Sequence, residues 1–365
     1  MRSAARNLLV AGVSCAVVFG GAEILLRVTG LAPSRALRSP DLHTLNSIPG
    51  LFEPGQELTD LVRRDLPARI RINNLGLRGR DLTERKPVNA WRLLCLGDSY
   101  TFGDHVNDED AYPARLEEEI RKLRPRTEAE VLNAGANGFG LLDEARFWSE
   151  KGRRLDPDVI ILAFSPNDIS DMTRPVPMID QMREHAALKE QPLIGPALRF
   201  LQNTATFNAL QILAARLSVL TRSHDAIPAI EPARAGPEAA PRAWEEYHRA
   251  LVAFGADVGR NLGRKAARIG TRTLLVLYPS YGNASGTERA FASEILPAWA
   301  DEAGLECLDL LPLFSRAASR GDLLYLVPKD AHPSPAGHRL AAAAIAARLD
   351  ALGWLVKEEE PNPAR

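Results

Sequence analysis

Three short motifs in this sequence carry side chains that could together cleave an ester. In chain order they are Gly97-Asp98-Ser99, Asn167-Asp168 and Asp330-Ala331-His332-Pro333. A serine hydroxyl can act as a nucleophile, a histidine oriented by an aspartate can act as its base and acid, and an asparagine amide can donate to an oxyanion. The motifs therefore predict a reaction class, acyl transfer from an ester, and say much less about the substrate.

Asp330 and His332 are expected to meet Ser99 in one cavity. Residues two apart in an extended segment project to the same face, so both side chains can reach one site. Asp330 would then hold the imidazole in the tautomer whose other nitrogen accepts the Ser99 proton. Ser99 and Asn167 each follow an apolar run, and ligands of α/β sheets bind at the carboxyl ends of such strands.

Taken singly, each motif also has a structural explanation. A serine can cap a helix, Asn167-Asp168 can form an Asx-turn, and a histidine near a helix start is usually structural. The glycine-rich stretch 133–138 lacks the Lys-Ser/Thr partner of a phosphate-binding loop. A metal site built from Asp330, His332 and His338 is disfavoured because no further ligands cluster nearby, so neither metal nor cofactor is expected.

Five apolar runs predict the strands that position these groups. They cover residues 91–96, 131–133, 159–164, 273–277 and, more weakly, 305–308. A short and nearly continuous apolar run is typical of a central strand buried on both faces. Helical stretches separate the runs, so the alternation predicts an α/β fold with a mostly parallel central sheet covered on both faces.

The alternation breaks between the third run and the fourth. Residues 196–220 have the composition of a fairly apolar helical stretch, and residues 227–241 are rich in proline and alanine, which predicts a flexible loop. We interpret about 170–242 as an insertion next to the active site. It is either a lid or a structural flap that does not contact substrate.

The first 31 residues predict a membrane anchor or signal segment. A basic start precedes an apolar segment of about the 20 residues that span a bilayer. Glu23 and Arg27 are four apart and can pair on a helix at the interface. A cleaved signal peptide is an alternative, because Gly20 and Ala22 fit a small-x-small site, and a lipoprotein site at Cys15 is a weaker one. If the segment is an uncleaved anchor, the protein is a single-pass membrane protein, and its catalytic domain is expected to be extracytoplasmic.

Composition indicates how the rest of the chain is divided and which kinds of partner or site it excludes. Residues 32–90 are interpreted as a juxtamembrane segment, residues 91–356 as the catalytic domain, and residues 357–365 as a polar tail. The formal net charge of −1 argues against nucleic acid as a partner, because phosphate neutralisation needs a clustered basic excess. The three cysteines provide neither a disulfide framework nor paired metal-ligand spacing.

Together the motifs resemble the SGNH (GDSL-type) hydrolase family. The four matching blocks, within about 91–352, are Gly97-Asp98-Ser99, Gly135 in the stretch 133–138, Ser165-Pro166-Asn167-Asp168 and Asp330-Ala331-His332-Pro333. The resemblance implies a three-layer α/β/α sandwich, with Ser99 as nucleophile, His332 as base and Asp330 as its orienter. It also implies an oxyanion hole formed by the N–H groups of Ser99 and Gly135 and the Asn167 amide.

Two positions depart from the pattern of that family. Ser165 stands where the third block usually begins with glycine. In the last block the aspartate usually lies three residues before the histidine, a place held here by Lys329, whereas Asp330 lies two before His332. The shorter spacing resembles the branch that includes alginate-type polysaccharide O-acetyltransferases.

The resemblance predicts a membrane-anchored serine esterase that cleaves short-chain or acetyl esters through an acyl-enzyme. Its partner would be an acyl ester, for instance an acetylated glycan. An O-acetyltransferase that modifies a cell-envelope polysaccharide shares the chemistry up to the acyl-enzyme, so the motifs do not separate the two. A non-catalytic, anchored binding protein that retained the fold is the third alternative.

Overall fold

A computed structural model describes most of the chain. It covers residues 2–32, 50–60, 68–221, 231–262, 271–328 and 330–356. The predicted polar tail at 357–365 and Lys329 lie outside the described residues, as do parts of the predicted juxtamembrane segment (33–49 and 61–67) and of the predicted loop (227–230).

The centre of the molecule is a parallel sheet with strand order β4-β3-β5-β6-β7. The strands are β3 (Trp91–Leu96), β4 (Ala129–Asn133), β5 (Val159–Phe164), β6 (Arg272–Leu277) and β7 (Glu306–Asp309). Each of the five predicted runs forms one of these strands. The order reverses around β3, which pairs with both β4 and β5. In such sheets the crevice at the reversal, outside the strand ends, is where ligands bind.

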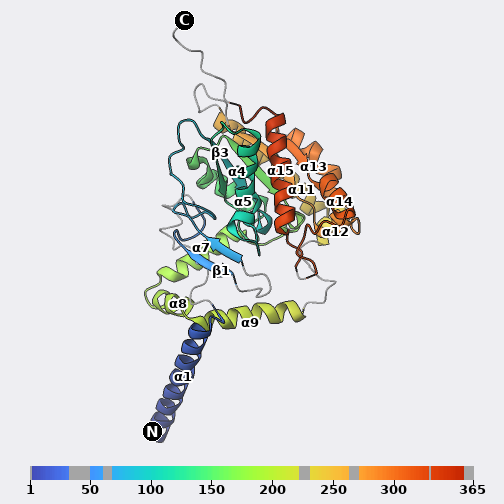
Figure 1. Ribbon diagram of the computed structural model, residues 1–365. Coiled ribbons are helices and arrows are strands. Elements are labelled where there is room, and N and C mark those ends of the chain that lie inside the picture. The colour runs from blue at the N-terminus through green and yellow to red at the C-terminus, as the bar shows by residue number, and fades with distance from the viewer. Residues whose placement is uncertain are drawn as a thin grey trace.

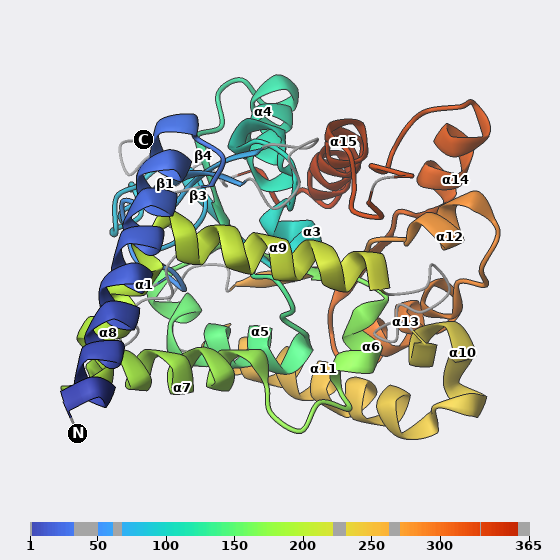
Figure 2. The same ribbon diagram turned by 90° about the horizontal axis from the view of Figure 1, so that it is seen from below.

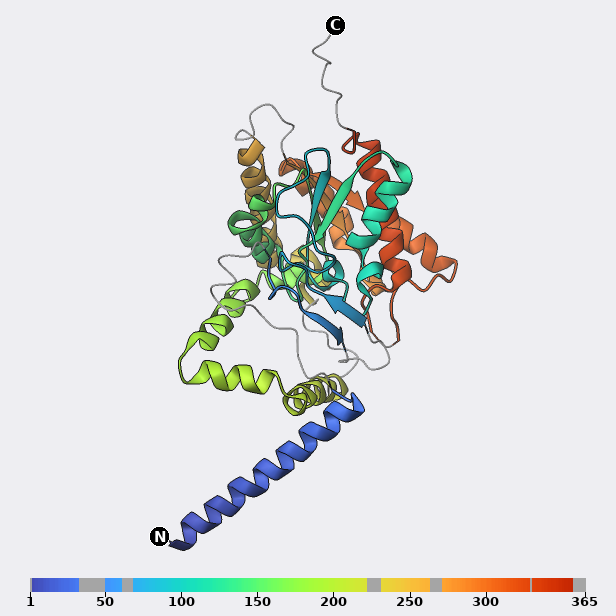
Figure 3. The same cartoon turned by 60° about the vertical axis from the view of Figure 1, so that its left-hand side comes forward.

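Helices cover both faces of the sheet, which confirms the predicted three-layer arrangement (Figure 3). The helices that pack on it are α4 (Tyr112–Leu123), α5 (Leu141–Glu150), α11 (Pro241–Leu262), α13 (Phe291–Glu302), α14 (Leu311–Ser319) and α15 (Pro335–Ala351). In β3, Leu94 and Leu96 pack toward α5, α11 and α13. Leu93 and Cys95 pack toward α4, α14 and α15. Burial on both faces explains why the strand reads as an uninterrupted apolar run.

The last helix begins where its cap signals predict. Ser334 Oγ accepts hydrogen bonds from the N–H groups of Ala336 and Gly337 at 3.2 Å. Pro335 occupies the first turn, where its missing N–H costs nothing. This start fixes the direction of the chain just after His332.

The described part of the predicted juxtamembrane segment folds onto the catalytic domain. Strands β1 (Glu57–Asp60) and β2 (Ala68–Arg71) form an antiparallel pair. The N–H of Arg71 donates to Asp108 Oδ2 at 3.0 Å, in the 3₁₀ turn η1 (Asp108–Asp110). Leu51, Ile72 and other apolar side chains of this segment join the core.

The described part of the region predicted as an insertion is mostly helical. It contains the end of α6 (Asn167–Asp171), then α7 (Met178–Glu190), α8 (Ile194–Gln202), α9 (Ala205–Thr221) and α10 (Glu231–Ala239). The predicted apolar helical stretch is thus two helices, α8 and α9. The predicted loop at 227–241 is wrong for residues 231–239, which are helical with a kink at Gly236 (φ 76°). Pro232 and Pro237 each lie near the start of a helical turn, where proline is tolerated.

The N-terminal helix α1 (Arg2–Thr29) extends away from the rest of the molecule (Figure 1). Its segment Leu9–Thr29 has 21 residues and a mean hydropathy of 2.1, and none of the segment is buried. By length and composition the segment has the properties of a membrane span, which a signal sequence shares.

Candidate active site

Ser99 begins the short helix α3 (Ser99–Phe102) directly after β3. Asp98 caps this helix, accepting a hydrogen bond from the N–H of Tyr100 at 2.8 Å. The predicted second block packs against α3 so closely that a Cβ on Gly135 would lie 2.3 Å from the Phe102 nitrogen. A side chain at Gly135 would therefore displace the helix that carries Ser99.

His332 lies beside Ser99 although 233 positions separate them in the chain. The distance from His332 Nε2 to Ser99 Oγ is 2.9 Å. On the other side of the ring, His332 Nδ1 contacts Asp330 Oδ1, which also accepts the backbone N–H of His332 at 2.8 Å. The two-residue spacing thus delivers a carboxylate to the imidazole despite its departure from the usual pattern.

The charges around His332 favour its protonated form. Burial alone would lower the pKa of His332, but the hydrogen bond with Asp330 and the negative charges of Asp104, Asp330 and Asp98 raise it to about 9. Burial alone would likewise raise the pKa of Asp330, yet the hydrogen bond and charge of His332 hold it far below its usual range. Asp330 is therefore ionised and stabilises an imidazolium.

Two further residues close to the ring were not predicted from the sequence. Asp104 Oδ2 lies 3.9 Å from His332 Nε2 and accepts a hydrogen bond from Asn137 Nδ2 at 2.6 Å. His105 Nε2 lies 3.6 Å from Asp330 Oδ2. Both follow Gly103 in a turn whose conformation, with His105 at φ 62°, has no clear sequence signal.

His105, Asp330 and His332 could each offer a ligand atom to a metal ion, because these atoms lie within 4.8 Å of one another. Structural zinc sites need four ligands and catalytic ones at least three. Here Nδ1 and Nε2 of His332 already face Asp330 and Ser99. The donor set is therefore arranged for hydrogen bonding around the imidazole and fits a metal poorly.

His338 does not share this group. It is fully buried in α15, and its Nδ1 accepts the N–H of Tyr112 at 3.2 Å. Burial, reinforced by the charges of Arg78 and His332, lowers the pKa of His338 to about 3, so the ring is neutral. Its role is to join α4 to α15.

Two of the three predicted oxyanion donors hydrogen-bond within the protein. The N–H of Gly135 donates to Asn133 Oδ1 at 3.0 Å. Asn167 Nδ2 donates to Asp171 Oδ2 at 3.2 Å, while Asn167 Oδ1 faces Ser165 Oγ at 2.7 Å. To serve an oxyanion, the Gly135 and Asn167 donors would have to share or exchange these partners.

Ser165 connects the first and third blocks. Its Oγ lies 2.7 Å from Asp98 Oδ2 and 2.7 Å from Asn167 Oδ1. The glycine usual at this position has no hydroxyl to make these contacts. In this chain the departure therefore links the turn that precedes Ser99 to the asparagine amide.

A group of buried carboxyl groups lies behind Asn167. Glu144 and Asp168 are almost completely buried, and burial, together with neighbouring negative charges, raises the pKa of each well above its ordinary value. Burial also raises the pKa of Asp171 to about 7, although Arg174 and Asn167 oppose the shift. Burial therefore favours the protonated form of each of these groups.

Arg78 holds the loop that follows α3. Its guanidinium donates to the carbonyl oxygens of Phe102 (2.8 Å), Gly103 (2.6 Å) and Val106 (2.7 Å), and pairs with Asp108 at 2.8 Å. The side chain is almost completely buried. Because those carbonyls belong to the turn that ends α3, Arg78 indirectly positions Ser99.

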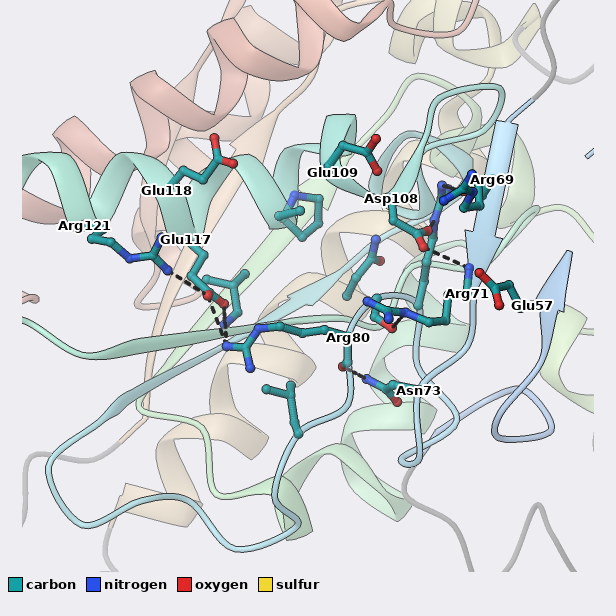
Figure 4. Close-up of a pocket in the computed structure, with 17 residues that line it drawn as sticks. Glu57, Arg69, Arg71, Asn73, Arg80, Asp108, Glu109, Glu117, Glu118 and Arg121 are labelled. Carbon is teal, nitrogen blue, oxygen red and sulfur yellow. Dashed lines mark hydrogen bonds and ion pairs between the residues drawn. The ribbon is translucent and has the colours of Figure 1, made fainter. Parts of the chain in front are cut away.

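A cavity of about 370 Å³ opens beside Arg78, between β2 and α4 (Figure 4). Its charged lining is mixed, with Arg80 and Arg121 both paired with Glu117. Neither Ser99, Asp330 nor His332 lines it. The cavity is therefore separate from the group around the imidazole.

Several solved structures resemble this chain at low sequence identity. One of them is LAE5, an alpha/beta hydrolase enzyme from the metagenome of Lake Arreo, Spain. The two sequences are 18% identical, the match covers 73% of this chain and 98% of that one, and the TM-score is 0.42. A catalytic mutant of Axe2, an acetylxylan esterase from Geobacillus stearothermophilus, has 16% identity, coverage of 75% and 100%, and a TM-score of 0.42. A two-domain esterase (CEX) active on acetylated mannans has 17% identity, coverage of 76% and 53%, and a TM-score of 0.43.

No curated protein matches the sequence. The sequence profile of the GDSL-like Lipase/Acylhydrolase family matches residues 95–340, which is well over half of the chain and spans all four motif blocks. This match confirms the resemblance inferred from the motifs. The chain belongs to the GDSL-like lipase/acylhydrolase family and is an ester hydrolase.

Proposed function

We propose that this protein is a membrane-anchored serine esterase that hydrolyses short-chain or acetyl esters, with Ser99, His332 and Asp330 acting as a triad. The observation that carries the proposal is the position of His332, whose Nε2 lies 2.9 Å from Ser99 Oγ while Nδ1 contacts Asp330. This is the contact that a general base needs to take the proton of a nucleophilic hydroxyl.

The proposed reaction has two halves. Ser99 Oγ attacks the ester carbonyl carbon as its proton passes to His332 Nε2, and the resulting imidazolium then protonates the departing alcohol. A water molecule, deprotonated by His332, next attacks the acyl-enzyme, and the proton returns to Ser99 as the carboxylic acid leaves. Asp330 remains ionised throughout and orients the ring.

The proposed oxyanion hole consists of the N–H groups of Ser99 and Gly135 and the Asn167 amide. Asn167 would give up its bond to Asp171, an exchange made easier when Asp171 carries a proton. One such donor is worth about 3 kcal/mol in the transition state. Ser165 would keep the amide pointed in the right direction during this exchange.

One observation favours a second candidate function. The two-residue spacing of Asp330 and His332 resembles the O-acetyltransferase branch, and a sugar hydroxyl can replace water in the second half-reaction. The first half-reaction is the same for an esterase and a transferase. The fate of the acyl group therefore separates them.

The experiment uses the full chain in detergent with 4-nitrophenyl acetate. Ser99→Ala should lower turnover by about 10⁴-fold or more. Ser149→Ala, an exposed serine whose Oγ donates to the Arg146 carbonyl, should leave it unchanged. Full activity of Ser99→Ala would contradict the proposal. Addition of an oligosaccharide acceptor then decides the function, because transfer in excess of hydrolysis would favour the acetyltransferase.

The proposed location is the membrane, with the catalytic domain outside the cytoplasm. The apolar segment of α1 supplies the anchor. Alkaline extraction of cell membranes tests this proposal, since a spanning helix keeps the protein in the membrane pellet. Release of the full-length chain into the supernatant would contradict it.

A further inference from the structure

The end of α1 is joined to the start of α9 by polar contacts that are half-buried around Glu23 and exposed around Arg27. The Glu23 carboxylate accepts hydrogen bonds from the N–H groups of Ala205 (3.0 Å) and Thr206 (2.9 Å), and from the Thr206 hydroxyl at 2.9 Å. The first N–H groups of a helix lack partners within the helix, and an acidic side chain there is favourable. Arg27 pairs with Glu23 at 2.6 Å and donates to the Asn203 carbonyl at 2.8 Å.

These contacts place the start of α9 at a defined depth relative to α1. Glu23 and Arg27 lie in the last turns of the apolar segment Leu9–Thr29. If that segment spans the bilayer, its last turns lie in the headgroup region. The α8–α9 junction, which touches those turns, must then lie in the same region.

One face of α9 exposes leucines. Leu210, Leu213 and Leu217 are 60%, 52% and 51% exposed. At about 100° per residue they form a single stripe, roughly opposite the buried residues Ala205 and Asn208. A stripe of exposed leucines on a soluble surface is unusual and marks an interaction surface.

The neighbouring helix α8 and the residue before it also expose apolar side chains. Phe200 is 64% exposed, and Leu193, just before the helix, is 89% exposed. Figure 1 shows α9 running across the end of α1, and Figure 2, seen from below, shows α3, which begins with Ser99, behind α9. The surface therefore lies between the catalytic end of the sheet and the level at which α1 leaves the domain.

We propose that α8 and α9 lie in the interface of the bilayer and hold the catalytic end of the domain against the membrane. The bilayer is the occupant that fits, because Glu23 and Arg27 attach α9, with its exposed leucines, to the end of the apolar segment that is proposed to span the membrane. A helix with an exposed apolar face at this depth buries that face at the boundary of headgroups and acyl chains.

The arrangement also indicates a class of substrate, an inference that rests on the proposed esterase activity. With the strand ends turned toward the membrane, Ser99 would meet acyl esters carried by membrane-tethered molecules. Esters free in solution would lack this guidance. We call α8 and α9 in this position the membrane platform. The platform would raise turnover of tethered esters without changing the chemistry at Ser99.

The test measures the depth of single fluorescent labels on the full chain in phosphatidylcholine vesicles. A Cys307→Ser background leaves Cys95 buried and Cys15 exposed in α1. With Cys15→Ser added, a label at Leu213→Cys or Phe200→Cys should be quenched by nitroxide lipids and protected from aqueous iodide. The matched control Glu245→Cys, exposed on α11, should show the reverse.

A label on native Cys15 separates failure of the platform from failure of the anchor. Lipid quenching at Cys15 with iodide quenching at Leu213→Cys and Phe200→Cys would overturn the platform and leave the anchor intact. Iodide quenching at Cys15 would overturn the anchor and the platform with it. Protection of Leu213→Cys from both quenchers would show protein rather than lipid over the stripe, and would also overturn the proposal.

A second measurement tests the substrate class. Leu210→Glu combined with Leu213→Glu should lower turnover of an O-acetylated sugar coupled to a dialkyl lipid in the vesicle severalfold. Turnover of the same O-acetylated sugar without the lipid should stay unchanged. Equal loss on both would show a general effect on folding or catalysis and contradict the proposal, and wild-type protein inactive on both would instead contradict the proposed function.

Discussion

The buried carboxyl side chains near the turn that carries Ser99 fall into two groups, whose pKa values are shifted in opposite directions. Asp330, beside His332, has a pKa far below its ordinary value. Glu144 and Asp168, which are almost completely buried and interact with each other, have pKa values well above theirs. Burial disfavours the charged form in both groups, so burial alone does not explain the difference.

The difference comes from a cationic partner. Asp330 contacts an imidazole that can carry a positive charge, whereas Glu144 and Asp168 mainly face other carboxyl groups. One side of the site therefore stabilises an imidazolium–carboxylate pair, which is the state that the proposed transfer of the Ser99 proton to the neutral imidazole would produce. The other side consists of carboxyl groups whose surroundings favour the neutral form, and one of them, Asp171, accepts a hydrogen bond from the Asn167 amide.

Removing the cationic partner should have the largest effect. His332→Ala deletes the proposed base and the charge that keeps Asp330 ionised, so kcat/KM on 4-nitrophenyl acetate should fall by about 10⁴-fold or more. The control is His248→Ala, since His248 pairs with Glu302 and stacks on Trp299 away from the site. A loss no greater than in this control would remove His332 from the reaction.

Removing the anionic partner should come next. Asp330→Asn keeps the shape but loses the charge, and the comparable change in a serine triad costs about 10⁴-fold in kcat. The pKa of His332, held near 9 in large part by Asp330, should fall toward its ordinary value. The acid limb of the pH–rate profile should therefore move to lower pH. A limb that stays in place would show that Asp330 does not set the His332 pKa.

On the other side of the site, the substitution expected to lower activity most is that of Asn167. Asn167→Ala removes one of the proposed oxyanion donors and should lower kcat by about 10²–10³-fold with little change in KM. Steady-state kinetics on the same ester provide the readout. A change confined to KM would indicate that Asn167 binds substrate without stabilising the transition state.

Among these substitutions, Asp171→Asn in the group of buried carboxyl side chains is expected to have the smallest effect on activity. The raised pKa of Asp171 means that its protonated form favours folding, so this contribution is present at acidic pH and is lost as pH rises through about 7. Asp171→Asn should therefore flatten the pH dependence of the free energy of unfolding between about pH 4 and 7. Urea unfolding at several pH values measures it, with Asp322→Asn, an exposed aspartate paired with Arg320, as control. An unchanged slope would show that Asp171 is ionised in the folded protein.

The sheet could be predicted from sequence because its strands are short, apolar and buried on both faces. The same runs also located Ser99 and Asn167, which directly follow β3 and β5. The proximity of His332 to Ser99 could be inferred only from chemistry and family resemblance, because no local pattern links residues 233 positions apart.

Other parts of the site had no sequence signal. Arg78 lies in a segment of mixed composition, and only the fold reveals that it binds the carbonyls that end α3. Asp104 reaches His332 because of the turn after Gly103, a conformation that composition does not specify. The helix at residues 231–239 was missed because its prolines suggest a loop, although both lie near the start of a helical turn.

The most direct test follows the rate at which a fluorophosphonate modifies the full chain as pH is varied, with the modified residue identified by mass spectrometry. Modification should occur at Ser99, and its rate should rise with pH and level off above about 9, as His332 loses its proton. Modification at another residue, or a rate at Ser99 that does not depend on pH, would contradict the proposed pairing of Ser99 with His332.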